Sequence, residues 1–164
     1  MSIKNNYSYS RQDSIKINTP IETMIRSIWD LDCWEEKLEH IKNIEILYDD
    51  GYNQEFLMGV KTENNSNIVN VRSIRRKNDD NSIEFFQPEP PEYLLHHAGL
   101  WSFSPINKDS VEVFLEHNWN LDNDTVKKLY PNLNFSSIEE KIENDLFDHA
   151  QASLNLWKTI LEKE

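Results

Sequence analysis

The sequence predicts an α+β protein in which one curved antiparallel β-sheet wraps around a long C-terminal helix, with two short helices after the first strand and an internal cavity. Three observations predict this architecture. About six alternating apolar and polar segments, joined by short turns, occupy residues 44–119. Two short helical patterns precede them, and one long helical pattern ends the chain. A strongly twisted antiparallel sheet curls, so a helix laid along its concave side is expected to leave a hollow.

Length and composition favour a single domain over residues 1–164, with residues 1–6 expected to be disordered. The formal net charge of -12 argues against nucleic acid and anionic membrane as partners, because a negative field repels both. Cys33 is the one cysteine of the sequence, so neither an internal disulfide nor a cysteine metal cluster is expected. The sequence shows no bilayer-spanning apolar run and no signal-peptide pattern, so the expected location is cytoplasmic.

The first part of the chain is predicted to hold one strand and two short helices. Residues 7–17 alternate weakly and suit a strand. The run Thr19-Pro20-Ile21-Glu22 combines a capping threonine, a first-turn proline and a capping-box glutamate, which predicts a helix to about Trp29. The apolar stripe of this helix is Ile21, Met24, Ile25 and Ile28. A second short helix begins at Asp30 or Asp32 and holds Trp34 and Leu38.

The middle of the chain is predicted to form antiparallel strands separated by turns. Asp49-Asp50-Gly51 is a tight hairpin signal, and residues 63–67, 78–81 and 105–109 have the composition of turns. The predicted strands are Ile44–Tyr48, Gln54–Val60, Ile68–Arg76, Ser82–Gln87, Tyr93–Phe103 and Val111–Trp119. In the strand from Tyr93, one face carries Leu95, His97, Gly99, Trp101 and Phe103. This mixture suits a cavity wall, although a satisfied strand histidine beside a core tryptophan would give the same pattern.

The last part of the chain is predicted to be a polar connector and then a long helix. The connector spans residues 121–135, with a short helix near Val126–Tyr130. Ser136 and Ser137, followed by Glu139 and Glu140, are expected to cap the final helix, which runs to about Leu161. Its stripe is Ile142, Leu146, His149, Ser153, Leu156, Trp157 and Ile160. This length suits a helix that lies along a curved sheet.

Several positions assigned to the inner face of the sheet are polar: Asn70, Arg72, Gln87, His97 and His117. Burying such groups without partners costs about 1–3 kcal/mol each, so they indicate a wet or ligand-filled cavity rather than a dry core. A shift of one residue in the register of two or three strands would instead turn these groups to solvent. The sequence alone leaves both arrangements open.

Taken in order, these residues resemble a known superfamily. The opening Thr19-Pro20-Ile21-Glu22, the Asp32-Cys33-Trp34 run and the Gly99-Leu100-Trp101-Ser102-Phe103 strand are similar to the START/Bet v 1-like (SRPBCC) superfamily, which has the helix-grip fold. Within it, the chain most resembles the polyketide aromatase/cyclase family. The resemblance extends from about Ser10 to Glu162.

The resemblance implies a cofactor-independent, metal-free enzyme. Such proteins take a poly-β-ketone tethered to an acyl carrier protein, promote a regiospecific intramolecular aldol cyclisation, and then promote dehydration to an aromatic ring. Arg72 matches the arginine proposed as the key residue in tetracenomycin-type members, and Trp34 matches the tryptophan of their second helix. Two departures stand out. Ile68 and Asn70 occupy positions where those relatives carry an aromatic and a hydroxyl residue, and Ile41, beside His40, stands where a tyrosine is expected.

The chemistry of an aldol cyclisation suggests roles for these residues. Arg72 would stabilise the enolate and the developing alkoxide, and His97 or His117 would move protons. Tyr93, Asn70 and Gln87 would hydrogen-bond the ketones. The side chains expected to shape the cavity are Trp34, Phe56, Met58, Phe85, Trp101 and Trp119. A structural ion pair remains open for Arg72, and for each histidine taken singly a structural role is favoured over a catalytic one.

Two other functions remain open at this stage. One is a non-enzymatic carrier of a hydrophobic ligand, such as a lipid, quinone or pigment, on the same fold. The other is an interaction subunit of a synthase complex, whose cavity would be small or filled. The basic cluster Arg72, Arg75, Arg76 and Lys77 would attract an acidic carrier protein, and self-association as a homodimer is left open. No metal site is expected, because the adjacent His96 and His97 face opposite ways on a strand.

Overall fold

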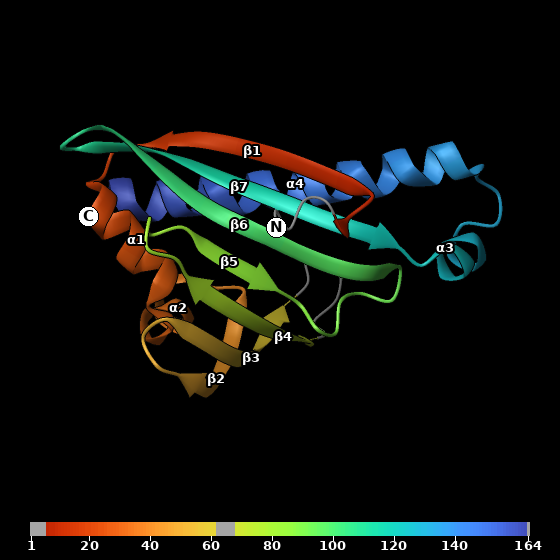
Figure 1. Ribbon diagram of the computed structural model, residues 1–164, viewed down its shortest axis with the longest axis horizontal. Helices are drawn as coiled ribbons and strands as arrows, with labels where there is room; N and C mark the ends of the chain where they lie inside the picture. The colour runs from red at the N-terminus through yellow and green to blue at the C-terminus, as the bar shows by residue number, and fades with distance from the viewer. Residues whose placement is uncertain (1–5, 62–67, 164) are drawn as a thin grey trace.

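The computed structural model describes residues 6–61 and 68–163 of the chain. These residues form the predicted curved antiparallel sheet and the long C-terminal helix, so the expected helix-grip architecture is confirmed (Figure 1). The strands lie in the order β1-β7-β6-β5-β4-β3-β2. Their bounds are β1 Tyr9–Ile17, β2 Ile41–Asp49, β3 Asn53–Lys61, β4 Ile68–Lys77, β5 Ile83–Phe86, β6 Leu94–Asn107 and β7 Ser110–Leu121.

The helices lie at the two ends of the sheet and along one face of it. In Figure 1, α4 runs lengthwise behind the sheet, α1 and α2 gather at one end, and α3 lies beyond the other end. The helices are α1 Ile21–Trp29, the 3-10 helix η2 Leu31–Cys33, α2 Trp34–Lys37, α3 Asn123–Leu129 and α4 Phe135–Glu162. Among the described helices, none is both long and apolar enough to cross a membrane.

The apolar core is divided into two clusters along α4. The larger cluster joins α1, the sheet and the C-terminal half of α4, with Met24, Ile28 and Trp157 at its centre. The smaller cluster joins α3 and the N-terminal half of α4 to the far ends of β6 and β7, around Trp119 and Ile142. A pocket lies between the sheet and the middle of α4, where His149 and Ser153 interrupt the apolar stripe.

Two predicted helix caps are wrong, and of the two predicted starts for the second short helix the structure has Asp30. Helix α1 begins at Ile21 with Pro20 at its N-cap and no side-chain cap, while Thr19 is buried. Helix α4 begins before the predicted serines, because Asn134 accepts a hydrogen bond from the Ser137 backbone N–H at 2.8 Å. At η2, Asp30 rather than Asp32 is the cap: its carboxylate accepts from the Asp32 N–H.

The first part of β6 departs from the predicted alternation. A register shift between Leu94 and His96 in the pairing with β7 turns Leu94 inward, to 4% exposure, and leaves Leu95 outside at 54%. From His97 onward the predicted faces are correct, because His97 and Trp101 are both buried. The predicted turn at residues 63–67 and nearly all of the predicted disordered N-terminus lie outside the described residues.

Candidate functional site

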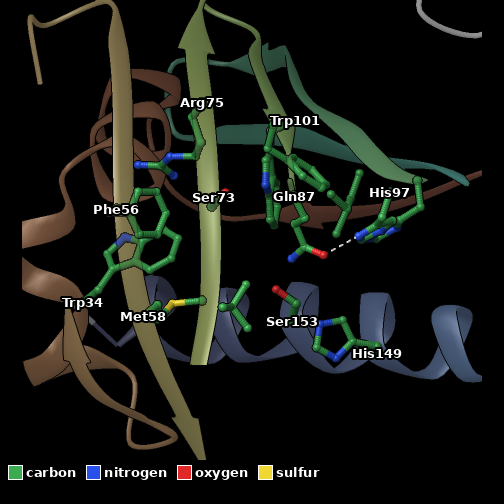
Figure 2. A pocket seen from close by; sticks show the side chains of 14 residues that line it. Trp34, Phe56, Met58, Ser73, Arg75, Gln87, His97, Trp101, His149 and Ser153 are labelled. Carbon is green, nitrogen blue, oxygen red and sulfur yellow. Dashed lines mark hydrogen bonds between the residues drawn. The ribbon is translucent and has the colours of Figure 1, made fainter. Parts of the chain in front are cut away.

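The candidate site is a pocket between the concave face of the sheet and α4, with a volume of about 130 Å³ (Figure 2). Strands β3 to β7 supply most of its wall, α2 supplies Trp34, and α4 supplies His149 and Ser153. Half of the fourteen lining residues are polar. The complete lining is Trp34, Phe56, Met58, Val71, Ser73, Arg75, Phe85, Gln87, His97, Trp101, Leu115, His117, His149 and Ser153.

Most of the predicted site residues lie together in this pocket. Those that line it are Trp34, Phe56, Met58, Phe85, Gln87, His97, Trp101 and His117. Those that lie elsewhere are Asn70, Arg72, Tyr93 and Trp119. The polar residues not predicted as site residues are Ser73, Arg75, His149 and Ser153.

The predicted inward position of Arg72 is wrong. Its guanidinium lies on the opposite face of the sheet, where it donates to the Glu55 carboxylate, with 2.7 Å between Nε and Oε1. Glu89 lies 3.7 Å from its Nη1. The side chain is 37% exposed. The structural ion pair that the sequence left open is therefore the arrangement found for Arg72.

The register between β3 and β4 explains this correction. Residues directly opposite each other on antiparallel strands point to the same face. Phe56 and Met58 point inward, and they pair with Ser73 and Val71 of β4. Arg72 pairs with the outward Leu57, and Asn70 is likewise exposed on the outer face. The predicted face of β4 was off by one residue, so the inward arginine is Arg75.

Arg75 is a buried guanidinium at the end of the pocket nearest α1 and is 3% exposed. Its Nε donates to Gln54 Oε1 at 3.1 Å. Nη1 donates to the Ile28 carbonyl at 2.8 Å and Nη2 to the Trp29 carbonyl at 2.9 Å. These carbonyls belong to the C-terminal end of α1, where a positive charge is favoured by the helix dipole. Arg75 therefore ties α1 to the sheet while it lines the pocket.

Aromatic rings surround the Arg75 guanidinium and keep it dry. Its central carbon lies 5.1 Å from the Trp34 ring centroid and 5.2 Å from those of Trp29 and Phe56, within cation–π range. Burial lowers the pKa of Arg75 to about 9, while the charge of Asp49 opposes that shift. Arg75 thus stays cationic at neutral pH, in surroundings where it would interact strongly with an anion.

The other end of the pocket holds a pair of histidines from neighbouring strands. The imidazoles of His97 and His117 lie parallel, with planes within 3° and centroids 5.4 Å apart. Phe85 meets both edge-on, with centroid distances of 6.0 Å to His97 and 5.8 Å to His117. His97 Nδ1 lies 2.6 Å from Gln87 Oε1. Among the described residues, His97 Nε2 and His117 Nδ1 are buried without a hydrogen-bond partner.

Burial keeps these two imidazoles neutral. It lowers the pKa of His97 to about 4 and that of His117 to about 3, and repulsion from neighbouring histidines adds to both shifts. His149 on α4 faces the same pocket, and burial lowers its pKa too. Protein surrounds the His149 ring closely enough to lower its pKa, yet part of the residue remains exposed to water. His149 is therefore the pocket histidine best placed to exchange a proton with solvent.

The two remaining predicted site residues lie outside the pocket. Trp119 faces inward as expected, but it packs in the smaller core cluster and stacks on Tyr9, with ring centroids 5.7 Å apart. Tyr93 precedes β6 and is half-buried in the same cluster. The sheet is longer than the pocket, and at its α3 end α4 packs directly on the strands. Facing inward was therefore not enough to place a side chain in the pocket.

Gly99 allows Phe85 to lie close to the strand, and it supports a prediction about packing. A Cβ at position 99 would lie under 3.0 Å from both Phe85 Cζ and the Glu116 backbone oxygen. Since the second neighbour is backbone, Gly99→Ala is expected to destabilise the fold by about 1–3 kcal/mol, which would lower the urea midpoint. The double variant Gly99→Ala/Phe85→Leu should recover only part of the loss. Full recovery, or no loss at all, would contradict this packing.

Comparisons with known proteins show the fold of this chain but do not show which reaction it catalyses. No family model matches the sequence, and no curated protein matches it. Among solved structures, the di-domain ARO/CYC StfQ from the steffimycin biosynthetic pathway is similar at 18% identity with a TM-score of 0.83. The match covers 98% of this chain and 53% of StfQ, so the chain spans about half the length of that protein.

Two further structures, which this chain covers to nine-tenths or more of their length, agree with this likeness. The Zhui aromatase/cyclase from Streptomyces sp. R1128 matches at 16% identity with a TM-score of 0.73, over 90% of each chain. A START superfamily protein from Mycobacterium smegmatis matches at 13% identity with a TM-score of 0.63, covering 89% of this chain and 94% of that one. The chain therefore has the START/Bet v 1-like helix-grip fold, in a form like that of the aromatase/cyclases.

Proposed function

We propose that this chain is a cofactor-independent aromatase/cyclase, which takes part of a carrier-bound poly-β-ketone into the pocket and promotes aldol ring closure and dehydration. The observation that supports the proposal is that one pocket holds both a cation and neutral hydrogen-bond acceptors. A dry guanidinium, Arg75, lies at one end, and uncharged imidazoles lie at the other. Aromatic side chains between them would hold a bent chain in place.

In this proposal the pocket residues divide the work of the aldol step. Arg75 stabilises the oxyanion that develops as the ring closes, and donors of this kind contribute about 10²–10³ in rate. Ser73 precedes Arg75 by two residues on the same face, so a hydroxyl residue does stand before the inward arginine. His97 and His117 accept hydrogen bonds from the enol form of the substrate, and His149 exchanges protons with water.

The size of the pocket limits what can enter it. A volume of about 130 Å³ is below the 300–1,000 Å³ of most drug-sized ligand sites. It is near the size of an engineered cavity that holds benzene, about 150 Å³. We therefore propose that the segment forming one ring occupies the pocket, while the rest of the chain and its carrier protein stay outside.

The carrier protein is not expected to dock through the basic cluster on β4. Arg72 pairs with Glu55, and Arg76 pairs with Glu84 at 3.1 Å. Arg75 is buried, and Lys77 lies over the Trp29 ring. Nearby acidic side chains thus offset much of the positive charge that the sequence suggested.

Ligand transport without catalysis is the second candidate function. It is favoured by the engagement of Arg75 in hydrogen bonds within the protein.

Filling the pocket tests the proposal. Ser153 lines the pocket on α4, while Asn155, two residues later, is exposed. With a minimal synthase and its carrier protein, the native chain should convert a mixture of spontaneous products into one aromatic product. Ser153→Phe should abolish that conversion, and Asn155→Phe should retain it. A native chain that binds aromatic ligands by tryptophan fluorescence but leaves the product mixture unchanged would replace the enzyme with the transport function.

A further inference from the structure

Gln87 makes one side-chain hydrogen bond that decides how His97 carries its proton. Gln87 Oε1 lies 2.6 Å from His97 Nδ1. A carbonyl oxygen can only accept a hydrogen bond, so Nδ1 must be the donor and must carry a hydrogen. In Figure 2 this contact joins Gln87, just beyond β5, to His97 near the start of β6. The amide thus fixes one of the two neutral forms of the ring.

The other ring nitrogen is then left as an acceptor. Because the buried His97 ring is neutral at physiological pH, a hydrogen on Nδ1 leaves a lone pair on Nε2. Nε2 is buried, and it has no hydrogen-bond partner within the described part of the chain. Leaving a buried polar atom unpaired costs about 1–3 kcal/mol, which a donor on a bound ligand would relieve.

The groups around His97 are compatible with the neutral Nδ1–H form of its ring. His117 on β7 stacks on the ring, and His149 on α4 disfavours a positive charge on it, as does burial. Arg75, the other titratable group of the lining, is a cation and does not stabilise a second one. Phe85 and Trp101 add apolar surface to the same wall. The surroundings therefore favour a neutral ring that accepts, and disfavour an imidazolium that donates.

We propose that Gln87 is a positioning residue that holds His97 in the Nδ1–H tautomer and so reserves Nε2 to accept a hydrogen bond from the substrate. The role rests on the proposed function, since it assigns one acceptor within that reaction. The substrate groups that fit are neutral hydrogen-bond donors, such as an enol or phenol hydroxyl. Water does not reach Nε2 in this structure, so a bound donor would supply the hydrogen bond that this atom lacks among the residues that the structure describes.

Two substitutions at position 87 separate positioning from packing. Gln87→Leu keeps the size but removes the acceptor, so His97 should move to the Nε2–H tautomer, which free imidazole side chains prefer. Gln87→Glu keeps an acceptor and adds a charge, so His97 should keep Nδ1–H and become protonated at higher pH. Gln12→Leu, the same change at an exposed position of β1, serves as the control.

The experiment combines histidine ¹⁵N NMR with the cyclisation assay. We expect Nδ1–H in the native chain, loss of that tautomer together with a kcat lower by about 10²-fold in Gln87→Leu, and little change in KM. In Gln87→Glu the acid limb of the kcat profile should move to higher pH. An Nε2–H or charged His97 in the native chain would overturn the assignment. Native kcat in a folded Gln87→Leu would overturn the positioning role.

The design distinguishes failure of this inference from failure of the proposed function. If the native chain forms no aromatic product, the proposed function fails, and the NMR result still decides the tautomer of His97 and its dependence on Gln87. If product forms and His97 is in the Nδ1–H form, but kcat is the same in Gln87→Leu and Gln12→Leu, the proposed function stands and the positioning role falls.

Discussion

Arg75→Lys is expected to lower the rate of ring formation by about 10²–10³-fold, whereas Arg72→Lys leaves it close to native. Both are arginines of β4, three positions apart, and they face opposite sides of the sheet. Lysine keeps the charge but loses the planar fork of donors that engages Gln54 and the α1 carbonyls. The measurement is the initial rate of aromatic product formation, with urea unfolding of each variant as the check on folding.

The same pair of positions separates structure from catalysis. Arg75→Ala would leave several buried acceptors unpaired and should destabilise the fold by about 3 kcal/mol or more. Arg72→Ala removes a part-exposed ion pair, which solvent screens, so the stability of this variant should stay close to native. Gln54→Glu is also expected to lower the rate of ring formation, because it places a carboxylate beside Arg75 without removing the guanidinium. A folded Gln54→Glu or Arg75→Lys variant with native activity would remove Arg75 from the mechanism.

The contrast between β3 and β4 shows why the sequence predicted one face correctly and missed the other. On β3, apolar Phe56 and Met58 alternate with Glu55, so the inner face is marked by hydrophobicity. On β4 both faces carry arginine, small polar residues and β-branched residues, so the alternation does not indicate which face points inward. The missing information is the pairing with β3, which is a long-range property of the folded sheet.

The sequence places the pocket residues of α4 on the predicted helical stripe but does not identify them as site residues. His149 and Ser153 fall on the predicted stripe, where helical spacing identifies the face but not what it meets. Whether a stripe position packs or lines a hollow depends on the curvature of the sheet opposite. For the same reason Trp119 was predicted to line a cavity, although its part of the sheet packs closely against α4.

Acid is expected to unfold this protein in a window set by its buried histidines. The folded pKa values of His97 and His117 lie near 4 and 3, below the value of about 6.5 for an unfolded histidine. As pH falls below about 6.5, these two histidines therefore bind protons in the unfolded chain but not in the folded chain. Stability should be fully present above that pH and should be lost progressively toward pH 4 and pH 3, because both pKa values are depressed.

The magnitude and the control follow from the same linkage. While both histidines are protonated only in the unfolded chain, the free energy of unfolding should fall by about 3 kcal/mol per pH unit. Urea denaturation at pH 7, 6, 5 and 4.5 measures that slope, and His40 and His149, whose pKa values are also lowered, contribute in the same direction. His97→Gln/His117→Gln should flatten the slope markedly, whereas His96→Gln, on the exposed face of β6, should keep it. Equal native stability at pH 7 and pH 4.5 would mean that the imidazoles reach water, and it would remove the dry acceptor on which the proposed hydrogen bond to the substrate depends.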